Sequence, residues 1–293
     1  MGAAPYVGRF APSPTGELHL GSLYTAAASY LDARANGGRW LLRIEDLDRP
    51  REVAGSSASI LDALEAFGFE WDGAIVRQSA RQDLYVAALA RLRQHGLLFD
   101  CSCSRQDLAD EDRYPGTCRE RPRLEGAAMG SRLRVEPRQI NFIDSIQGQF
   151  RQDVAATCGD LLLKRRDQIF AYVLAVVVDD ADTGVTHVLR GADLLDNTPR
   201  QIYLQQALGL PTPHYAHVPV ISEPDGTKLA KSRRSLRLDA GAPMAQLLLV
   251  FKLLGLSPPD NLLHTSIGEA WNWATARWDL ARLPKGFCLP LPA

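Results

Sequence analysis

The sequence has almost no net charge. Across 293 residues, 33 lysines and arginines face 34 aspartates and glutamates, which leaves a formal charge of −1 and a pI near 6.6. Such a chain is not drawn to nucleic acid by overall attraction, so any nucleic acid would have to bind at a local basic surface. Two arginine-rich stretches, residues 119–134 and 164–166, could supply such a surface.

Two other absences narrow the class of protein. No apolar run is long enough to span a bilayer, and the N-terminus lacks the basic segment and apolar run of a secretory signal. The sequence also has no internal repeat and no low-complexity tract. We therefore expect a cytoplasmic protein with no membrane contact, built as one large domain with insertions or as a few modules.

Cysteine is scarce and unevenly placed. Three of the five cysteines, Cys101, Cys103 and Cys118, fall in one short stretch, and an odd total does not make a complete disulfide framework. In a reducing compartment a tight cluster favours a metal over disulfides, and three thiolates are a strong start for a tetrahedral zinc site. The other two, Cys158 and Cys288, are predicted to be ordinary core or surface thiols.

Lysine is rare as well, with only five in the whole chain. Two of them, Lys228 and Lys231, lie in the segment Lys-Leu-Ala-Lys-Ser, which arginines follow directly. Since arginine carries the basic charge elsewhere, lysine at these positions suggests a need for a compact point charge. Taken alone, a basic run of this kind is most often a solvated face or a nucleic-acid patch.

The chain is organised around residues 9–22, which link a short apolar run to the first amphipathic segment. Two prolines stiffen this loop, Gly16 and Gly21 permit close backbone approach, and the apolar residues that follow recur at helical spacing. A strand, a small-residue loop and a helix N-terminus together form an anion site, where His19 could donate to a phosphate. The alternative is that His19 is an ordinary turn histidine, and this stretch alone does not decide between the two.

The N-terminal part predicts an α/β fold. Residues 5–10 and 40–44 have the pattern of strands on either side of a helix, which indicates a right-handed parallel crossover. Glu45 follows the second strand directly, at the sheet edge where open α/β folds bind their ligands. Ser56 and Ser57 are expected to cap the next helix, which would leave Glu45 free to meet a cation.

The rest of the pattern divides the chain into parts. The segment 217–221 is predicted to be a strand, whereas residues 170–174 could belong to a helix or a strand. We expect a split Rossmann nucleotide-binding domain of residues 1–96 and 167–238, an insertion with the candidate zinc site over 97–166, and a short helical region over 239–293.

Two motifs far apart in the chain resemble the paired signatures of class I aminoacyl-tRNA synthetases. The segment His19-Leu20-Gly21-Ser22 is similar to the "HIGH" motif, and Lys228-Leu229-Ala230-Lys231-Ser232 is similar to the "KMSKS" motif. Further phrases look like the glutamyl branch of these enzymes, and the matches cover most of residues 6–238. These phrases are residues 9–16, 42–48, 177–180 and 186–191.

The resemblance narrows to the glutamyl-queuosine tRNA(Asp) synthetase family. A full glutamyl-tRNA synthetase carries a long anticodon-binding region, whereas this chain ends about fifty residues past its lysine loop, so we expect no anticodon-binding domain. The resemblance implies a ligase that activates glutamate with ATP, without tRNA, and attaches it to queuosine at the wobble position of tRNA(Asp), with no obligate protein partner. A short glutamyl-tRNA synthetase that charges the 3′ end of tRNA is the main alternative. A catalytically silent tRNA-binding module and a nucleotidyltransferase agree less well with the motifs.

The resemblance also implies a glutamate pocket. Arg9 would face the side-chain carboxylate of the substrate and Glu45 would accept from its α-ammonium, which agrees with the bidentate fork that a guanidinium offers to a carboxylate. For Arg190 a structural ion pair with Asp193 or Asp196 is the alternative. The glutamate-binding residues implied by the resemblance are Arg9, Ser13, Glu45, Tyr172 and Arg190.

In the same family the α-carboxylate of glutamate attacks the α-phosphate of ATP. This reaction requires positive groups that balance the negative charge on the phosphoryl oxygens and on the leaving pyrophosphate. His19, the helix N-terminus after it, Lys231 and Mg²⁺ would supply that stabilisation. Ser22 and Ala230 depart from the family's motifs, but neither change removes the charge of His19 or Lys231. The implied ATP-binding residues are His19, Gly21, Lys228 and Lys231, with His19 and Lys231 as the catalytic pair.

The resemblance adds Tyr114 to the three cysteines as the fourth ligand of one structural zinc ion per chain. A phenol with a reference pKa of about 10 is a reluctant ligand unless the metal ionises it. Glu111 and Asp112 therefore remain alternatives for the fourth position.

Overall fold

The computed structural model describes residues 5–104, 106–109, 111, 113–121, 128–222 and 237–291. Within these residues no helix is both long and apolar enough to cross a membrane. None of the five cysteines, all of which are described, forms a disulfide.

The N-terminal crossover is confirmed. Strands β1 (Val7–Phe10) and β2 (Arg39–Ile44) pair in parallel on either side of helix α1 (Leu20–Ala35), and the short β3 (Val76–Arg77) continues the sheet beyond β2. Most of α1 is buried because it packs against β1 and β2 and also contacts the C-terminal helices. Its small side chains permit that close approach, since a run of alanines occupies its middle.

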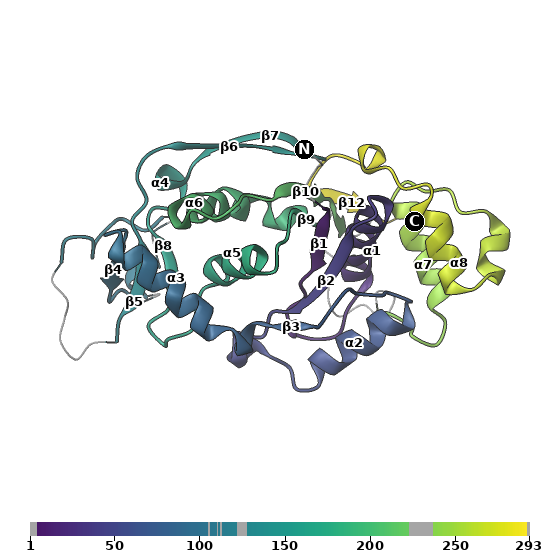
Figure 1. Cartoon of the computed structure of the whole chain (residues 1–293), viewed down its shortest axis with the longest axis horizontal. Coiled ribbons are helices and arrows are strands. Elements are labelled where there is room, and N and C mark those ends of the chain that lie inside the picture. Colours follow the sequence, from purple (N-terminus) through teal and green to yellow (C-terminus); the bar gives the residue numbers. More distant parts are fainter. Residues whose placement is uncertain are drawn as a thin grey trace.

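A second sheet has the order β7-β6-β10-β9. Strands β9 (His187–Gly191), β10 (His214–Val218) and β6 (Gln139–Asp144) run parallel, and β7 (Gly148–Asp153) returns beside β6 as a hairpin. Strand β6 thus comes from the segment 97–166 but joins the sheet that contains β9 and β10. Figure 1 shows this hairpin along one long side of the molecule, above α6.

The two sheets adjoin at β1 and β9. The backbone N–H of Thr186, just before β9, donates to the carbonyl of Val7 at 2.9 Å, and the rings of Tyr6 and His187 stack with centroids 3.9 Å apart. Residues at the carboxyl ends of both strands, Phe10 of β1 and Gly191 of β9, line one cavity. In an open α/β fold that position is where ligands bind.

The segment 97–166 also forms a small antiparallel sheet of its own. Strands β4 (Leu98–Cys101), β5 (Gly130–Leu133) and β8 (Leu161–Lys164) make it, and a separate cluster of buried residues lies beside it: Phe99, Cys101, Tyr114 and Cys118. The helices of the central part are α2 (Ser56–Ala66), α3 (Gln82–Gln94), α4 (Val154–Thr157), α5 (Tyr172–Asp182) and α6 (Thr198–Leu208).

The structure decides one segment that the sequence left open and corrects one predicted strand. The chain enters α5 at Tyr172, so the undecided segment 170–174 is mostly helical, and Ala171 is still extended. The predicted strand 217–221 is wrong as one element, because β10 ends at Val218 and β11 (Val220–Ser222) begins after Pro219. Proline lacks the N–H that a continuous ladder would require.

The C-terminal region is helical as predicted but also adds a strand. Helices α7 (Pro243–Leu253) and α8 (Ile267–Thr275) pack against α1, and β12 (Cys288–Pro290) pairs in parallel with β11. In Figure 1 these helices form one end of an elongated molecule, and β4, β5 and α3 lie toward the other end.

Candidate functional site

A cavity of about 1130 Å³ opens at the carboxyl ends of β1 and β9. Residues from both sheets reach it, because β1 supplies Arg9, β9 supplies Arg190, and Glu45 directly follows β2. All the predicted glutamate-binding residues and two of the predicted ATP-binding residues line it: Arg9, Ser13, Glu45, Tyr172, Arg190, His19 and Gly21. The predicted Lys228 and Lys231 lie outside the described residues.

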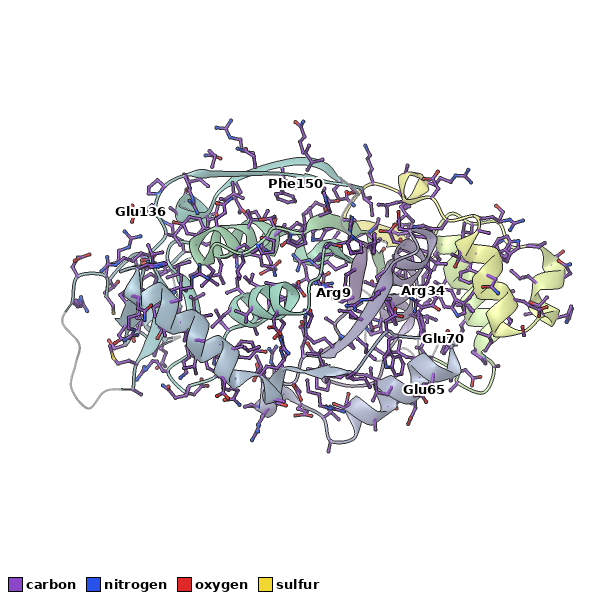
Figure 2. The ribbon with its side chains drawn as sticks, viewed as in Figure 1. Arg9, Arg34, Glu65, Glu70, Glu136 and Phe150 are labelled. Carbon is purple, nitrogen blue, oxygen red and sulfur yellow. The ribbon has the colours of Figure 1, made fainter. Side chains whose placement is uncertain are left out.

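Arg9 belongs to a buried chain of alternating charges. Its Nε donates to Asp180 at 3.3 Å, Asp180 accepts from Nη1 of Arg43 at 2.6 Å, and Nη2 of Arg43 donates to Oε1 of Glu45 at 3.2 Å. Arg9 lies near the middle of the molecule, as Figure 2 shows. Glu45 therefore meets one cation within the protein, Arg43, through its Oε1 atom.

This chain of charges leaves specific atoms available for a ligand. No described residue accepts a hydrogen bond from Nη1 or Nη2 of Arg9, and none donates to Oε2 of Glu45. Burial alone would raise the pKa of Asp180, but the guanidiniums of Arg43 and Arg9 outweigh burial and hold that pKa below its usual range. Burial raises the pKa of Glu45, and Arg43 and Arg9 oppose that rise.

Sequence reasoning missed Arg43 and Asp180. A signal for Asp180 was present, because two aspartates close the otherwise apolar run Val176–Val178 in α5, and buried carboxylates require partners. Nothing in the local pattern names Arg43 as that partner, since the two residues are 137 positions apart.

Arg190 is held by neutral groups. Its Nε donates to Nε2 of His217 at 3.0 Å and its Nη1 to the hydroxyl of Tyr172 at 3.3 Å, while Nη2 donates to Thr198 at 2.9 Å and Gln201 at 2.8 Å. Among the described residues it makes no ion pair with the suggested aspartates. Its positive charge is therefore not cancelled by direct contact with a carboxylate.

His19 is the N-cap of α1. Its Nδ1 accepts from the backbone N–H of Ser22 at 3.2 Å, so in the neutral ring the proton lies on Nε2. A Cβ at Gly21 would lie 3.1 Å from Cε1 of His19, so glycine there gives the ring its place over the first turn. This arrangement sets an imidazole beside the positive end of a helix, as an anion site requires.

The loop before α1 is fastened by Ser56. The predicted serine cap is wrong, because the N-cap of α2 is Gly55, at φ 80°, and it makes no side-chain bond. Instead the hydroxyl of Ser56 accepts from the N–H of Gly16 at 3.1 Å and donates to the carbonyl of Gly16 at 2.6 Å. One buried side chain thus satisfies both backbone groups of a residue that lines the cavity.

We expect Ser56→Ala to lower the free energy of unfolding by about 1–3 kcal/mol, because it leaves two backbone groups of Gly16 without their partner. Ser57→Ala is the matched control, since the buried hydroxyl of Ser57 has no partner among the described residues. Chemical denaturation of the three proteins measures the difference. Equal stability of the two variants would contradict the role of Ser56.

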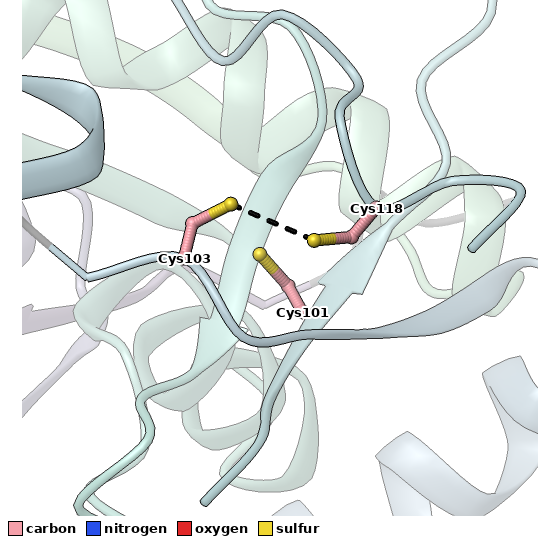
Figure 3. Close-up of side chains that lie close together, drawn as sticks. All are labelled: Cys101, Cys103 and Cys118. Atoms are coloured by element: carbon pink, nitrogen blue, oxygen red, sulfur yellow. Dashed lines mark hydrogen bonds between the residues drawn. The ribbon is translucent and has the colours of Figure 1, made fainter. Parts of the chain in front are cut away.

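The three clustered cysteines come together as predicted (Figure 3). Their Sγ atoms lie within 4.8 Å of one another, and those of Cys103 and Cys118 are 3.5 Å apart. Tyr114 directs its hydroxyl to the same point, 3.5 Å from Sγ of Cys101. Zinc bonds of about 2.3 Å to sulfur and 2.0 Å to oxygen give tetrahedral ligand separations of roughly 3.5–3.8 Å, so this donor set fits the ion.

The surroundings of the cluster favour the anionic form of Cys118, whereas burial raises the pKa of Tyr114 and of Cys103. The backbone N–H of Cys118 donates to the Tyr114 oxygen at 2.8 Å, and the Arg132 guanidinium lies 3.8 Å from the centre of the Tyr114 ring. Burial raises the pKa of the Cys118 thiol, but hydrogen bonds from Ser102 and Tyr114 outweigh it and lower that pKa to about 6. Among the described residues the cluster contains no carboxylate, so Glu111 is not part of it, and Asp112 lies outside the described residues.

Comparisons with known proteins agree with this geometry. Residues 6–262 match the family of class I tRNA synthetase catalytic domains for glutamate and glutamine. Two solved glutamate-tRNA synthetases, from Elizabethkingia anophelis and Elizabethkingia meningosepticum, superpose with TM-scores of 0.82 and 0.83 at 28% identity, over 98% of this chain and 68% of theirs. The second was solved with its amino acid. The fold and the site therefore define the catalytic domain of a class I aminoacyl-tRNA synthetase, a ligase.

Relatives with higher sequence identity than these solved structures show which family within this class the chain belongs to. The glutamyl-Q tRNA(Asp) synthetase of Ectopseudomonas mendocina is 53% identical over 96% of this chain and 95% of its own length. Those of Pseudomonas aeruginosa (52%, over 98% of this chain and 97% of theirs) and Neisseria meningitidis (50%, over 96% and 98%) are nearly as similar. The chain belongs to the glutamyl-Q tRNA(Asp) synthetase family.

Proposed function

We propose that this protein activates glutamate with ATP and transfers it to the queuosine base at the wobble position of tRNA(Asp). The observation that carries the proposal is the cavity itself, in which arginines from two strands and a glutamate that follows a third converge beside a histidine at a helix N-terminus. Relatives that carry this activity in their name share half of their residues with this chain over nearly its whole length.

In this proposal the substrate's charges meet the atoms that the protein leaves available. The side-chain carboxylate binds Nη1 and Nη2 of Arg9, and Oε2 of Glu45 accepts from the α-ammonium. Tyr172 and Arg190 complete the pocket, and Ser13 lines it. Because Asp180 and Arg43 hold Arg9 and Glu45 in place, the two recognition groups are fixed relative to each other before glutamate binds.

The α-carboxylate then attacks the α-phosphate of ATP, and pyrophosphate leaves. Nε2 of His19 and the N-terminus of α1 stabilise the phosphoryl oxygens, with Gly21 permitting close approach, and Mg²⁺ bound with ATP would supply further positive charge. Lys228 and Lys231 are proposed to act on the same phosphates. In support, Ile221 and Arg237, which flank that segment, both line the cavity.

Cys101, Cys103, Tyr114 and Cys118 are proposed to hold one structural zinc ion. Bound there, the ion would cross-link β4 to the chain that follows it. The donor set of three thiols and a phenol, with separations close to those of a tetrahedral site, supports this assignment.

The tRNA is proposed to dock beside the glutamate pocket, in the reducing environment of the cytoplasm. Arg51 and Arg165 both contact Asp48, at 2.7 Å and 3.7 Å. Asp48 and Arg51 line a smaller cavity that shares Ser13 and Glu45 with the main one. These guanidiniums are therefore close enough to hold loop phosphates while a single-stranded base enters the pocket.

The proposal is tested by finding which tRNA accepts the glutamate. We expect radiolabelled glutamate to transfer to tRNA(Asp) that carries queuosine and not to the same tRNA with guanosine at the wobble position. Transfer should survive removal of the 3′-terminal adenosine and weaken steeply with salt, because phosphate contacts release counterions. Charging of tRNA(Glu) at its 3′ end instead would make the protein a short glutamyl-tRNA synthetase.

A further inference from the structure

A buried line of three residues lies behind the glutamate pocket. Asp144, His217 and Arg190 come from the neighbouring strands β6, β10 and β9, and they are only 2%, 0% and 4% exposed. Asp144 Oδ2 lies 2.6 Å from His217 Nδ1, and His217 Nε2 lies 3.0 Å from Arg190 Nε. The line therefore runs across the sheet from a carboxylate to the guanidinium at the cavity wall.

The contacts determine which nitrogen of His217 carries its proton. Arginine Nε–H can only donate, so His217 Nε2 must accept, and the single proton of the neutral ring lies on Nδ1, where it is donated to Asp144. The Thr198 hydroxyl, 3.2 Å from Nε2, can donate to the same atom. Burial lowers the pKa of His217 and the hydrogen bond to Asp144 opposes that, but burial together with the Arg190 charge keeps this pKa below its usual value.

Backbone hydrogen bonds fix the orientation of the Asp144 carboxylate. Its Oδ1 accepts from three backbone N–H groups, those of Ile146 at 3.0 Å, Gln147 at 2.8 Å and His217 at 3.1 Å. Only Oδ2 is left for the imidazole. The carboxylate is thereby fixed by the turn between β6 and β7, and it fixes the ring in turn.

We infer that Asp144 and His217 are positioning residues which, by setting the tautomer of the imidazole, aim Arg190 at Tyr172 and the glutamate pocket. The inference rests on the proposed glutamate site. Arg190 uses Nε for His217 and Nη2 for Thr198 and Gln201, so its remaining nitrogen, Nη1, faces Tyr172. A specificity group on the cavity wall is thus oriented by a strand that reaches the sheet from the segment between the two catalytic halves.

Asp144→Asn tests the tautomer. The amide oxygen can keep the three backbone N–H bonds, while the amide nitrogen presents a donor to His217 Nδ1. The ring then moves its proton to Nε2, where it opposes the Nε–H of Arg190. We expect the KM for glutamate in ATP–pyrophosphate exchange to rise about 10- to 100-fold, the loss of one hydrogen bond to a charged group, with the KM for ATP unchanged.

Nitrogen-15 NMR of labelled histidine reads the tautomer without substrate. Only six histidines contribute signals, and His217→Phe assigns the one that matters. We expect the Nδ1–H form in the native protein and the Nε2–H form in Asp144→Asn. Persistence of the Nδ1–H form in the variant, or a switch without any rise in the glutamate KM, would overturn the inference.

Two further variants separate positioning from stability. Asp32→Asn makes the same change at a buried carboxylate that accepts from Tyr6 and Trp278 and does not line the cavity, so the glutamate KM should stay constant. His217→Gln keeps an acceptor for Arg190 and should raise that KM less than His217→Phe, even if Asp144→Asn does not fold. Equal effects of the two His217 variants would count against the inference.

A native enzyme without glutamate-dependent exchange would overturn the proposed function, and the inference with it.

Discussion

Glu45→Gln is expected to lower kcat/KM for glutamate by roughly a hundredfold or more. The substitution leaves an amide oxygen for Arg43 but removes the negative charge that the α-ammonium requires, and breaking a buried charge pair costs about 2–5 kcal/mol. Because the contact with Arg43 at 3.2 Å can persist, folding should be largely spared. The measurement is ATP–pyrophosphate exchange at varied glutamate concentration.

Glu52→Gln is the matched control for this variant. Glu52 is exposed and lines only the smaller neighbouring cavity, so the same chemical change should leave glutamate activation near the native value. If the two variants behave alike, Glu45 does not bind the ammonium.

The raised pKa of Glu45 also predicts that glutamate activation depends on pH. Burial raises the pKa of Glu45, and the ammonium is bound by the deprotonated form. Activation should therefore be complete at high pH and decline as the pH falls through a pKa above that of an ordinary glutamate. In Glu45→Gln this acid limb of the glutamate KM profile should disappear.

Loss of zinc is the second large effect that we expect. Tyr114→Phe keeps the ring under Arg132 but removes the oxygen that lies 3.5 Å from Cys101, and Cys118→Ser removes a thiolate. Structural zinc binding amounts to about 10–16 kcal/mol in small zinc-finger peptides, and here the local core is only a few residues. Elemental analysis should fall from one zinc per chain to well below one, and the segment around β4 and β5 should unfold at lower temperature.

Cys158→Ser supplies the comparison for the zinc experiment. Cys158 is half-buried, and its thiol contacts the hydroxyl of Thr157 and no part of the cysteine cluster. This variant should keep full zinc occupancy. Full occupancy in Tyr114→Phe as well would assign the fourth ligand to another residue, and Asp112 would be the first to test.

Local patterns were sufficient for much of the fold. The crossover of β1, α1 and β2 follows from short-range alternation and from the glycines and prolines that bound each element. The close approach of Cys101, Cys103 and Cys118 follows equally from their nearness along the chain. Two distant motifs resemble the paired signatures of class I aminoacyl-tRNA synthetases. The structure describes residues of the first motif, and His19 and Gly21 of that motif line the same cavity as Arg9 and Glu45.

The groups that hold the site in place depend on the tertiary structure alone. Asp144 meets His217 across 73 positions of sequence, and Arg43 meets Asp180 across 137. No local sequence pattern predicts either pair, because each pair forms only when elements from distant segments of the chain become neighbours. The sequence, through its resemblance to a known family, indicated which residues are candidates for recognising glutamate and phosphate. Only the packing of the two sheets decided which buried charges orient them, since desolvated charges must find partners wherever the fold supplies them.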